Sequence, residues 1–263
     1  MTADPPAETT PVSGQGPGWT RRVARLAVLT GAGISTDSGI PDFRGPSGVW
    51  TRNPGAEKLS TYQAYMADPE LRRRSWQGRL AHPAWTAQPN AAHLAVARLA
   101  RGVTDTQVIT QNIDGLHQRA GTPPGRVIEL HGTMFGVVCT GCGDRTAMAD
   151  ALDRVRAGED DPPCGRCGAI LKSATVMFGQ ALDPRVFERA AVVAARCDLL
   201  LAVGSTLTVE PAASLCTIAA EAGASLVIVN RDPTPYDAAA TEVIREPIGE
   251  AVPRIADQLL GAR

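Results

Sequence analysis

Short apolar, β-branched segments recur along the chain, and helical patterns separate several of them. The segments lack the polar–apolar alternation of a half-exposed strand, so each is predicted to be a strand buried on both faces. Helical patterns cover residues 89–102, with Asn90 as a candidate N-cap, residues 114–121, and residues 211–223, with Pro211 in the first turn. Strands that alternate with helices predict an α/β fold, a parallel sheet with helices on both faces. The predicted strands are 23–30, 106–110, 126–130, 197–204, 225–230 and 241–245.

Length and charge exclude several classes of protein. The 263 residues suffice for one large core and a smaller accessory module. A net charge of −1 gives no basic field that would attract nucleic acid or anionic lipid. No apolar stretch reaches the ~18 residues of a transmembrane helix, and the N-terminus lacks the pattern of a secretory signal. We therefore expect a cytoplasmic protein without membrane partners, of unknown oligomeric state.

Three stretches do not follow the pattern of alternating strands and helices. Residues 1–20 are rich in Pro, Gly, Thr and Ala, which predicts a disordered N-terminal tail. Residues 48–88 are rich in Trp, Pro and Arg and predict a helical insertion. Residues 133–175 have little apolar periodicity and need another source of stability. The large domain is then expected to consist of residues 21–47, 89–132 and 176–263.

Four of the six cysteines form two C-x2-C pairs within residues 133–175. Cys139 and Cys142 form the first pair, and Cys164 and Cys167 follow after 21 residues. In a reducing compartment this spacing predicts a four-thiolate zinc site, which is structural because no coordination position stays open. A zinc ribbon that binds nucleic acid is the alternative. Acidic residues outnumber basic ones between the pairs, which argues against it.

A glycine-rich stretch, GAGIS at residues 31–35, directly follows the first predicted strand. Ligands of open parallel sheets bind beyond the carboxyl ends of the strands, and glycines let the backbone approach a phosphate closely. The spacing does not match the dehydrogenase fingerprint, because the third glycine is Gly39 and no acid follows at the expected distance. The stretch either binds a dinucleotide in another manner or is an unliganded turn.

The motifs of this chain, taken together and in order, resemble those of the sirtuins, which are NAD-dependent protein-lysine deacylases. The resemblance spans nearly the whole chain after residue 22. It implies a Rossmann-like NAD-binding domain with a small zinc-binding domain and a helical insertion, NAD consumed as co-substrate, and one structural Zn²⁺. The motifs are GAGISTDSGIPDFRG (31–45), TQNIDGLHQRAG (110–121), ELHG (129–132), the two cysteine pairs, VMFGQ (176–180), GSTLTVEPAA (204–213) and VNRDPT (229–234).

The resemblance implies a catalytic role for three residues. His131 would be the general base, and Asn112 and Asp114 would line the nicotinamide pocket. Asp114 is also a good N-cap for the helix expected after it, and both roles are compatible. In the implied reaction the amide oxygen of an acyl-lysine attacks C1′ of the nicotinamide ribose and nicotinamide leaves. His131 then activates a ribose hydroxyl, which attacks the imidate carbon. Water finally adds and releases free lysine and O-acyl-ADP-ribose.

Further positions would bind the cofactor. Asp42, Phe43 and Arg44 would lie on a loop over it, with the aromatic ring excluding water from a bond that is prone to hydrolysis. Without the resemblance, a surface loop whose ring fills a local gap would be the simpler interpretation. The other cofactor-binding positions are Gly31, Ala32, Gly33, Ser35, Gln111, Asn112, Asp114, His131, Gly204, Ser205, Thr206, Asn230, Arg231 and Ile248.

Acyl-lysine proteins or peptides are the implied partners. Val176, Phe178 and Gly179 would bind the peptide as an added strand, in a mode that depends on main-chain hydrogen bonds. Val176 and Phe178 would also line the tunnel for the acyl-lysine side chain; without the resemblance, the segment would be an ordinary buried strand. The chain departs from the usual sirtuin pattern at Ser173, where proline is common, and at Gln180, where an acid is usual. The second departure removes a negative charge near the expected path of the peptide.

The preferred acyl group stays open. Sirtuins that remove succinyl or malonyl groups carry a Tyr and an Arg three residues apart in the insertion, and the nearest match here is Trp76 with Arg79. Arg79 could pair with an acyl carboxylate, but Trp76 supplies no phenol oxygen, and Arg79 could also be one more surface arginine.

Three other functions compete with deacylation. An ADP-ribosyltransferase would use the same scaffold, and the sequence does not distinguish the two. A non-catalytic NAD-binding protein would not need His131, Asn112 and Asp114. A dehydrogenase is disfavoured by the glycine spacing.

Overall fold

The computed structural model describes residues 17–20, 23–45, 48–53, 55, 61–103 and 105–261. Most of the predicted tail, residues 1–16, lies outside this part of the chain. Gly18–Thr20 form a short 3-10 helix, η1, and Trp19 packs into the main core at 9% exposure. The indole nitrogen of Trp19 donates to Glu242 Oε2 at 2.5 Å. The expected disorder is therefore wrong for residues 18–20, because a large aromatic ring anchors this segment to the core.

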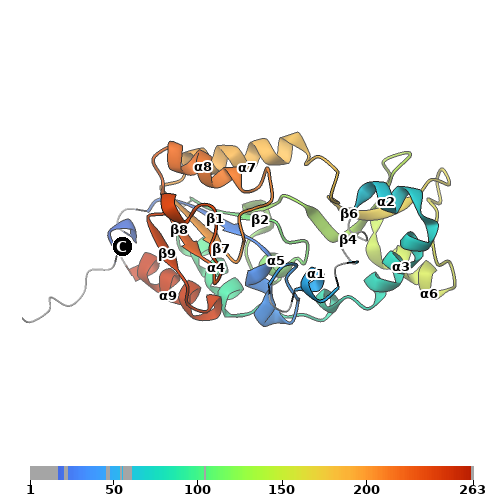
Figure 1. Ribbon diagram of the computed structural model, residues 1–263, viewed down its shortest axis with the longest axis horizontal. Helices are drawn as coiled ribbons and strands as arrows, with labels where there is room; N and C mark the ends of the chain where they lie inside the picture. Colours follow the sequence, from blue (N-terminus) through green and yellow to red (C-terminus); the bar gives the residue numbers. More distant parts are fainter. Residues whose placement is uncertain are drawn as a thin grey trace, which may run out of the picture.

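A fully parallel six-stranded sheet forms the centre of the larger part of the molecule (Figure 1). The strand order is β3-β2-β1-β7-β8-β9, and it reverses between β1 and β7. Such a reversal is the position at which open α/β sheets bind ligands. All six predicted strands are present, with shorter bounds for most: β1 (Arg25–Thr30), β2 (Asp105–Thr110), β3 (Val127–Glu129), β7 (Leu199–Val203), β8 (Ser225–Val229) and β9 (Glu242–Ile244).

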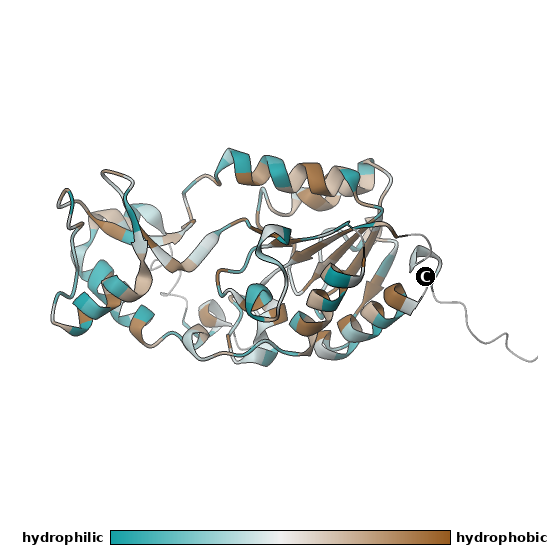
Figure 2. Cartoon of the chain, turned by 180° about the vertical axis from the view of Figure 1, so that it is seen from behind, coloured by the Kyte–Doolittle hydropathy of each residue, from teal (hydrophilic) through white to brown (hydrophobic). Residues whose placement is uncertain are grey.

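Helices cover both faces of this sheet, which confirms the predicted α/β class. Figure 1 shows α7 and α8 over one face and α4 and α9 under the other. The strands themselves are hydrophobic along their length (Figure 2). Successive side chains of β1 enter opposite cores: Leu26 and Val28 pack on one side, and Ala27 and Leu29 on the other. The helices are α4 (Ala91–Gly102), α7 (Pro184–Arg196), α8 (Ser214–Glu221) and α9 (Ile248–Gly261).

Two of the three predicted helices differ from expectation. The helix over 89–102 is confirmed as α4, and Asn90 Oδ1 caps it by accepting from the N–H of Ala92 at 3.0 Å. The predicted first turn at Pro211 is wrong, because residues 211–213 form a turn and α8 begins only at Ser214. The helix over 114–121 shrinks to one turn, α5 (Leu116–Arg119), because Gly115 is left-handed with φ 68°.

A second, three-stranded antiparallel sheet carries the cysteine pairs. Its order is β5-β4-β6, and α6 packs against β4. The preceding stretch is helical, as predicted, and Trp76 of α3 is fully buried in the core beneath this sheet. No helix among the described residues is long and apolar enough to cross a membrane. The elements are α1 (Val49–Arg52), α2 (Tyr62–Ala67), α3 (Pro69–Leu80), β4 (Gly132–Cys139), β5 (Arg145–Ala147), α6 (Met148–Arg156) and β6 (Leu171–Thr175).

Candidate active site

The glycine-rich turn after β1 interlocks with the turn after β7. The N–H of Gly31 donates to Val203 O at 3.0 Å, and the N–H of Gly33 donates to Gly204 O at 2.8 Å. A Cβ on Gly31 or Gly33 would lie 2.8 Å from backbone atoms of Gly204, which itself has φ 62°. Glycine is needed at all three positions because backbone packs directly on backbone. The two turns therefore form one surface at the reversal point of the sheet.

A hydrogen-bonded network joins the first turn to the segment after β2. The turn continues into the 3-10 helix η2 (Ala32–Ser38), where Ser35 Oγ donates to Asp114 Oδ2 at 2.7 Å. Asn112 Nδ2 donates to Gly31 O at 3.0 Å and to Ser35 Oγ at 3.2 Å. Asp114 is 5% exposed and its Oδ1 accepts from the N–H of Leu116. The N-cap position of α5 is Gly115, so the prediction that Asp114 is the N-cap is wrong by one residue. Four of the predicted site residues, Gly31, Ser35, Asn112 and Asp114, thus lie in one network.

His131 is held by the same segment. Its Nδ1 lies 2.8 Å from Gln111 O, and the Gln111 side chain donates to Ser205 Oγ at 2.9 Å. A carbonyl oxygen only accepts, so Nδ1 carries the proton and Nε2 of the neutral ring keeps a free lone pair. Burial lowers the pKa of His131, and the hydrogen bond to Gln111 opposes this more weakly. At neutral pH the site therefore contains a base at Nε2.

The positions expected on the adenosine side are less tightly connected. Asn230 Nδ2 donates to Asp232 O at 2.8 Å, and Arg231 pairs with Asp232 at 3.0 Å. Thr206 Oγ1 lies 2.9 Å from Thr208 Oγ1. Within the described part of the chain, no hydrogen bond links these side chains to the network around Asp114.

Two features bring further predicted positions toward the turn after β1. Ile248 begins α9, and a Cβ on the next residue, Gly249, would lie 2.9 Å from Asp37 Oδ2 of η2. The carboxylate of Asp42 adds to the rise in the pKa of Arg231, behind the larger effect of Asp232. The loop with Asp42 and the end of β8 are therefore electrostatic neighbours.

The segment after β6 passes directly beside His131. The N–H of Val176 donates to His131 O at 2.8 Å. Two residues later, Phe178 O accepts from the N–H of Tyr62 at 2.9 Å, and its ring is 38% exposed. One backbone edge of Phe178 is thus occupied by the insertion. The predicted substrate segment and the predicted base are joined by one hydrogen bond.

Gln180 closes a tight turn at the end of this segment. Its N–H donates to Met177 O and its Oε1 accepts from the N–H of Met177, both at 3.0 Å. Gly179 lies between them with φ 85°, and a side chain there would collide with Gln63. The neutral amide at 180 therefore makes a local contact that a carboxylate would also make, but it adds no charge to the surface.

The loop that was expected to cover the cofactor contacts an aromatic residue that the sequence analysis did not identify. Asp42 Oδ1 accepts from the N–H of Gly45 at 2.9 Å, which shapes the loop. Phe43 is 44% exposed and its ring centroid lies 5.0 Å from that of Trp50. Arg44 places its guanidinium 4.7 Å from the same Trp50 ring. The sequence signal that could have identified Trp50 is its position shortly after the motif of residues 31–45.

Arg79 is partly buried rather than a free surface arginine. Its Nη1 donates to Ser75 Oγ at 2.8 Å, and its guanidinium lies 5.7 Å from the Trp76 ring. Burial lowers the pKa of Arg79, and Tyr65 opposes this. Among the described residues, no ion pair or hydrogen bond joins Arg79 to another predicted site residue. The structure does not bring it into the network around Asp114.

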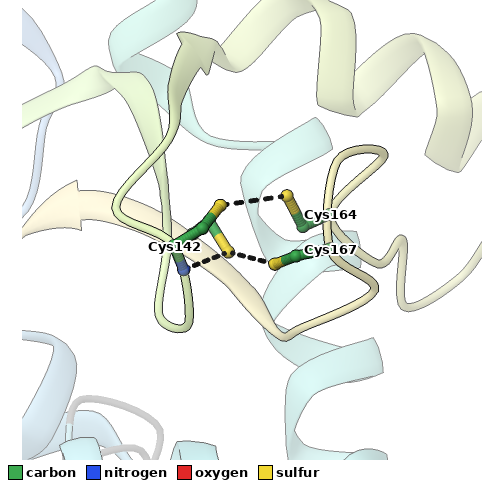
Figure 3. Close-up of side chains that lie close together, drawn as sticks. Cys142, Cys164 and Cys167 are labelled. Atoms are coloured by element: carbon green, nitrogen blue, oxygen red, sulfur yellow. Dashed lines mark hydrogen bonds between the residues drawn. The ribbon is translucent and has the colours of Figure 1, made fainter.

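The two cysteine pairs meet at the edge of the three-stranded sheet. Figure 3 shows Cys142, Cys164 and Cys167 converging from two loops, and Cys139 completes the group. The Sγ atoms of Cys139 and Cys167 are 3.4 Å apart, those of Cys142 and Cys164 are 3.8 Å apart, and all four lie within 4.8 Å of one another. Tetrahedral zinc with Zn–S bonds of about 2.3 Å needs sulfurs about 3.8 Å apart. The donor set therefore fits zinc.

Comparisons with known proteins agree with this arrangement. Residues 31–211 match the model of the Sir2 family. The chain is 60% identical over 230 residues to NAD-dependent protein deacetylase 2 of Streptomyces coelicolor, an alignment that covers 88% of this chain and 95% of the relative. NAD-dependent protein deacetylase 1 of Bradyrhizobium diazoefficiens is 44% identical, over 86% of this chain and 88% of the relative.

Solved structures show the same similarity. A structure described under the mechanism and regulation of Sir2 enzymes superposes with a TM-score of 0.83 at 37% identity, covering 93% of this chain and 96% of that one. A Sir2 structure with a p53 peptide and NAD⁺ has a TM-score of 0.81 at 34% identity, covering 91% and 95%. Given these similarities and the interlocked glycine turns, the chain belongs to the Sir2 family.

Proposed function

We propose that this chain is an NAD-dependent protein deacetylase that removes acyl groups from lysine side chains and releases nicotinamide and O-acyl-ADP-ribose. The observation that carries the proposal is the position of His131. Its Nδ1 is fixed by Gln111 O, no hydrogen bond from the described residues occupies its Nε2, and its backbone joins the segment proposed to bind peptide. The Sir2 relatives named as NAD-dependent deacetylases support the same activity.

NAD fits the crevice at the reversal point of the sheet. The backbone packing of Gly31, Gly33 and Gly204 leaves a surface without side chains, which suits the close approach of a pyrophosphate. Ala32, Ser35, Gln111, Ser205 and Thr206 are proposed to line it, with Asn230, Arg231 and Ile248 on the adenosine side. The cofactor supplies the glycosidic bond to nicotinamide that is broken in the reaction.

The residues around that bond are proposed to have three different roles. Asn112 and Asp114 are proposed to form the nicotinamide pocket, since Ser35 and Gly31 hold both side chains in place. At its Nε2 atom, which the tautomer leaves unprotonated, His131 accepts the proton of a ribose hydroxyl group. Asp42, Phe43 and Arg44 are proposed to exclude water, which would otherwise compete as the nucleophile.

Acyl-lysine peptides are proposed to pair with the Val176–Gly179 segment. The insertion already occupies the edge of Phe178 that carries its carbonyl, so the peptide is expected on the opposite edge. Solved Sir2 structures contain a p53 peptide with NAD⁺ and an acetylated peptide. Main-chain pairing of this kind carries little sequence information, so selectivity is expected to be loose.

Zinc is proposed to stabilise the module of residues 133–175. Four thiolates close the coordination sphere, so the metal supports the fold and takes no part in the reaction. The thiols persist as ligands in a reducing compartment, which supports a cytoplasmic location. We propose the domain division that the sequence predicted, with one change. The large domain comprises residues 21–47, 89–132 and 176–263 and the insertion residues 48–88, but the N-terminal tail ends before Gly18 instead of at residue 20, because Trp19 packs into the core.

Arg79 is the candidate for recognition of an acidic acyl group. Its guanidinium is partly desolvated and its described partners are neutral, so a carboxylate that reaches it would gain a strong, charge-assisted contact. The test compares acetyl and succinyl forms of one peptide on wild type and on Arg79→Met. Selective loss of succinyl turnover supports the role. Equal turnover of both peptides in the two proteins removes it.

The activity itself is tested by measuring nicotinamide release from NAD with an acetyl-lysine peptide, followed by mass spectrometry of the peptide. Wild type should release nicotinamide and a peptide lighter by one acetyl group. His131→Ala should lose the deacetylated peptide, because His131 acts after nicotinamide leaves. His82→Ala, at a half-buried histidine outside the network, should keep both products. Nicotinamide release with ADP-ribose transferred to protein would instead identify an ADP-ribosyltransferase, which the named relatives do not favour.

A further inference from the structure

Three aromatic rings from three separate segments touch in series beside the proposed site. The ring of Trp50 lies 5.0 Å from Phe43 on one side and 5.2 Å from Phe178 on the other, with interplanar angles of 47° and 59°. We call Phe43, Trp50 and Phe178 the aromatic bridge. Tilted ring pairs at these distances attract each other beyond their apolar burial. The bridge therefore connects the proposed cofactor loop with the proposed peptide segment.

One end of the bridge is fixed by backbone contacts. The N–H of Val49 donates to Asp42 O at 2.8 Å, and the N–H of Trp50 donates to Phe43 O at 3.0 Å. A Cβ on Gly48 would lie 2.6 Å from Phe43 backbone atoms, so these two stretches pack without space for a side chain. Trp50 and the loop that carries Phe43 are consequently expected to move as one unit.

The rings are more exposed than a structural core requires. Phe43 is 44% exposed and Phe178 is 38% exposed, and the Arg44 guanidinium lies over Trp50, where a cation–π contact holds the ring. A purely structural cluster would bury these faces. Exposed aromatic faces next to a ligand site leave apolar area for the ligands to cover.

We propose that Trp50 is a positioning residue that couples occupancy of the acyl-lysine site at Phe178 to the position of Phe43 over the cofactor. This proposal rests on the function proposed above. An acyl-lysine side chain against Phe178 limits the positions of Trp50, and Trp50 carries the cofactor loop with it. Binding of the two substrates is then linked, and linkage requires that each strengthens the other equally.

The coupling is measured with carba-NAD, an analogue whose nicotinamide bond is not cleaved. Isothermal titration gives its Kd with and without a saturating acetyl-lysine peptide. For wild type we expect the peptide to lower this Kd about fivefold or more. In Trp50→Leu the change should shrink to less than about twofold, because Leu cannot contact both rings, and Trp50→Phe should restore most of it.

Trp85→Leu is the matched control. Trp85 is also half-buried in the insertion, but its ring contacts Phe135 at 5.4 Å and none of the bridge. This variant should keep the wild-type coupling. A second readout is the ratio of nicotinamide released to peptide deacetylated. The ratio should stay near one in wild type and Trp85→Leu, and rise in Trp50→Leu, where the loop no longer responds to the peptide.

The outcomes separate this proposal from the proposed function. Wild type that fails to bind carba-NAD or to release nicotinamide overturns the function and the coupling together. Wild type that binds both ligands without coupling overturns only the role of Trp50. The same follows if folded Trp50→Leu, checked by its thermal midpoint, keeps full coupling and a product ratio near one.

Discussion

Acid is expected to destabilise the fold through two histidines buried close to the candidate site. His93 and His117 are 0% and 1% exposed, and their ring centroids are 5.1 Å apart. Burial lowers the pKa of His93 to about 4 and that of His117 to about 3, from an ordinary 6.5. Asp114 weakly opposes the shift at His93, and His93 adds to the shift at His117. His93 Nε2 and His117 Nδ1 lack a hydrogen-bond partner among the described residues.

The sign follows from proton binding by the two states. Between pH 6.5 and about 4 the unfolded chain binds one proton at each histidine, whereas the folded chain binds none. The contribution of the two neutral histidines to the unfolding free energy is therefore fully present above pH 6.5. It is lost progressively as the pH falls below 6.5, until the histidines of the folded chain also become protonated. Two such groups together remove about 3 kcal/mol of unfolding free energy between pH 7.5 and 5.5, and His117 accounts for about half of it.

Urea unfolding of wild type and His117→Gln at pH 7.5 and 5.5 measures this effect. The difference between the two pH values should be smaller in the variant by about 1 kcal/mol. Titration of thiols, carboxylates and bound zinc is common to both proteins and cancels in the comparison. His82→Gln is the control, and it should change the difference less because that ring is only partly buried. An equal pH difference in wild type and His117→Gln would refute the reasoning.

Three further changes have defined outcomes. Cys142→Ala should leave the chain without the one zinc ion expected in wild type and lower its thermal midpoint, measured by metal analysis and calorimetry; full zinc content would contradict the four-thiolate site. Gly204→Ala places a Cβ against the backbone of Ile34 at a residue with φ 62°, so it should cost about 2 kcal/mol of stability and weaken NAD binding. If the thermal midpoint from calorimetry and the Kd for NAD from titration are unchanged, the two turns separate easily. At low salt, Gln180→Glu should raise kcat/KM severalfold for peptides that carry a Lys beside the acyl-lysine, because the new carboxylate attracts that Lys. If kcat/KM for such a peptide, divided by kcat/KM for a neutral peptide, is the same in wild type and variant, position 180 lies away from the peptide.

Several parts of the fold were predictable because they depend on local pattern. The strand predicted over 225–230 is apolar from Leu226 to Val229, and burial on both faces of a parallel sheet requires such a pattern. The cysteine spacing predicted a cluster that the structure assembles. Trp19 was missed because its anchoring depends on Glu242, 223 positions away. The start of α8 was missed because proline is common both in turns and in the first turn of a helix, and residues 211–213 form a turn here.

The candidate site was predictable as a set of residues but not as an arrangement. The resemblance to sirtuins identified His131, Asn112 and Asp114, yet none of these residues reveals its partners in the sequence. Ser35 and Asp114 are 79 positions apart, and their contact arises because β1 and β2 end at the same edge of the sheet. Trp50 carried no family signal in the sequence analysis and became visible only through its two ring contacts.

The sequence by itself determined the class of fold, the order of the motifs and the chemistry available at each, because hydrophobic period, glycine content and thiol spacing are local properties. Only the tertiary structure decided the tautomer of His131, the interlocking of Gly31 and Gly33 with Gly204, and the position of Trp50 between two loops. Each of these depends on contacts between segments far apart in the chain. Such contacts are set by the packing of the sheet, which no local pattern encodes.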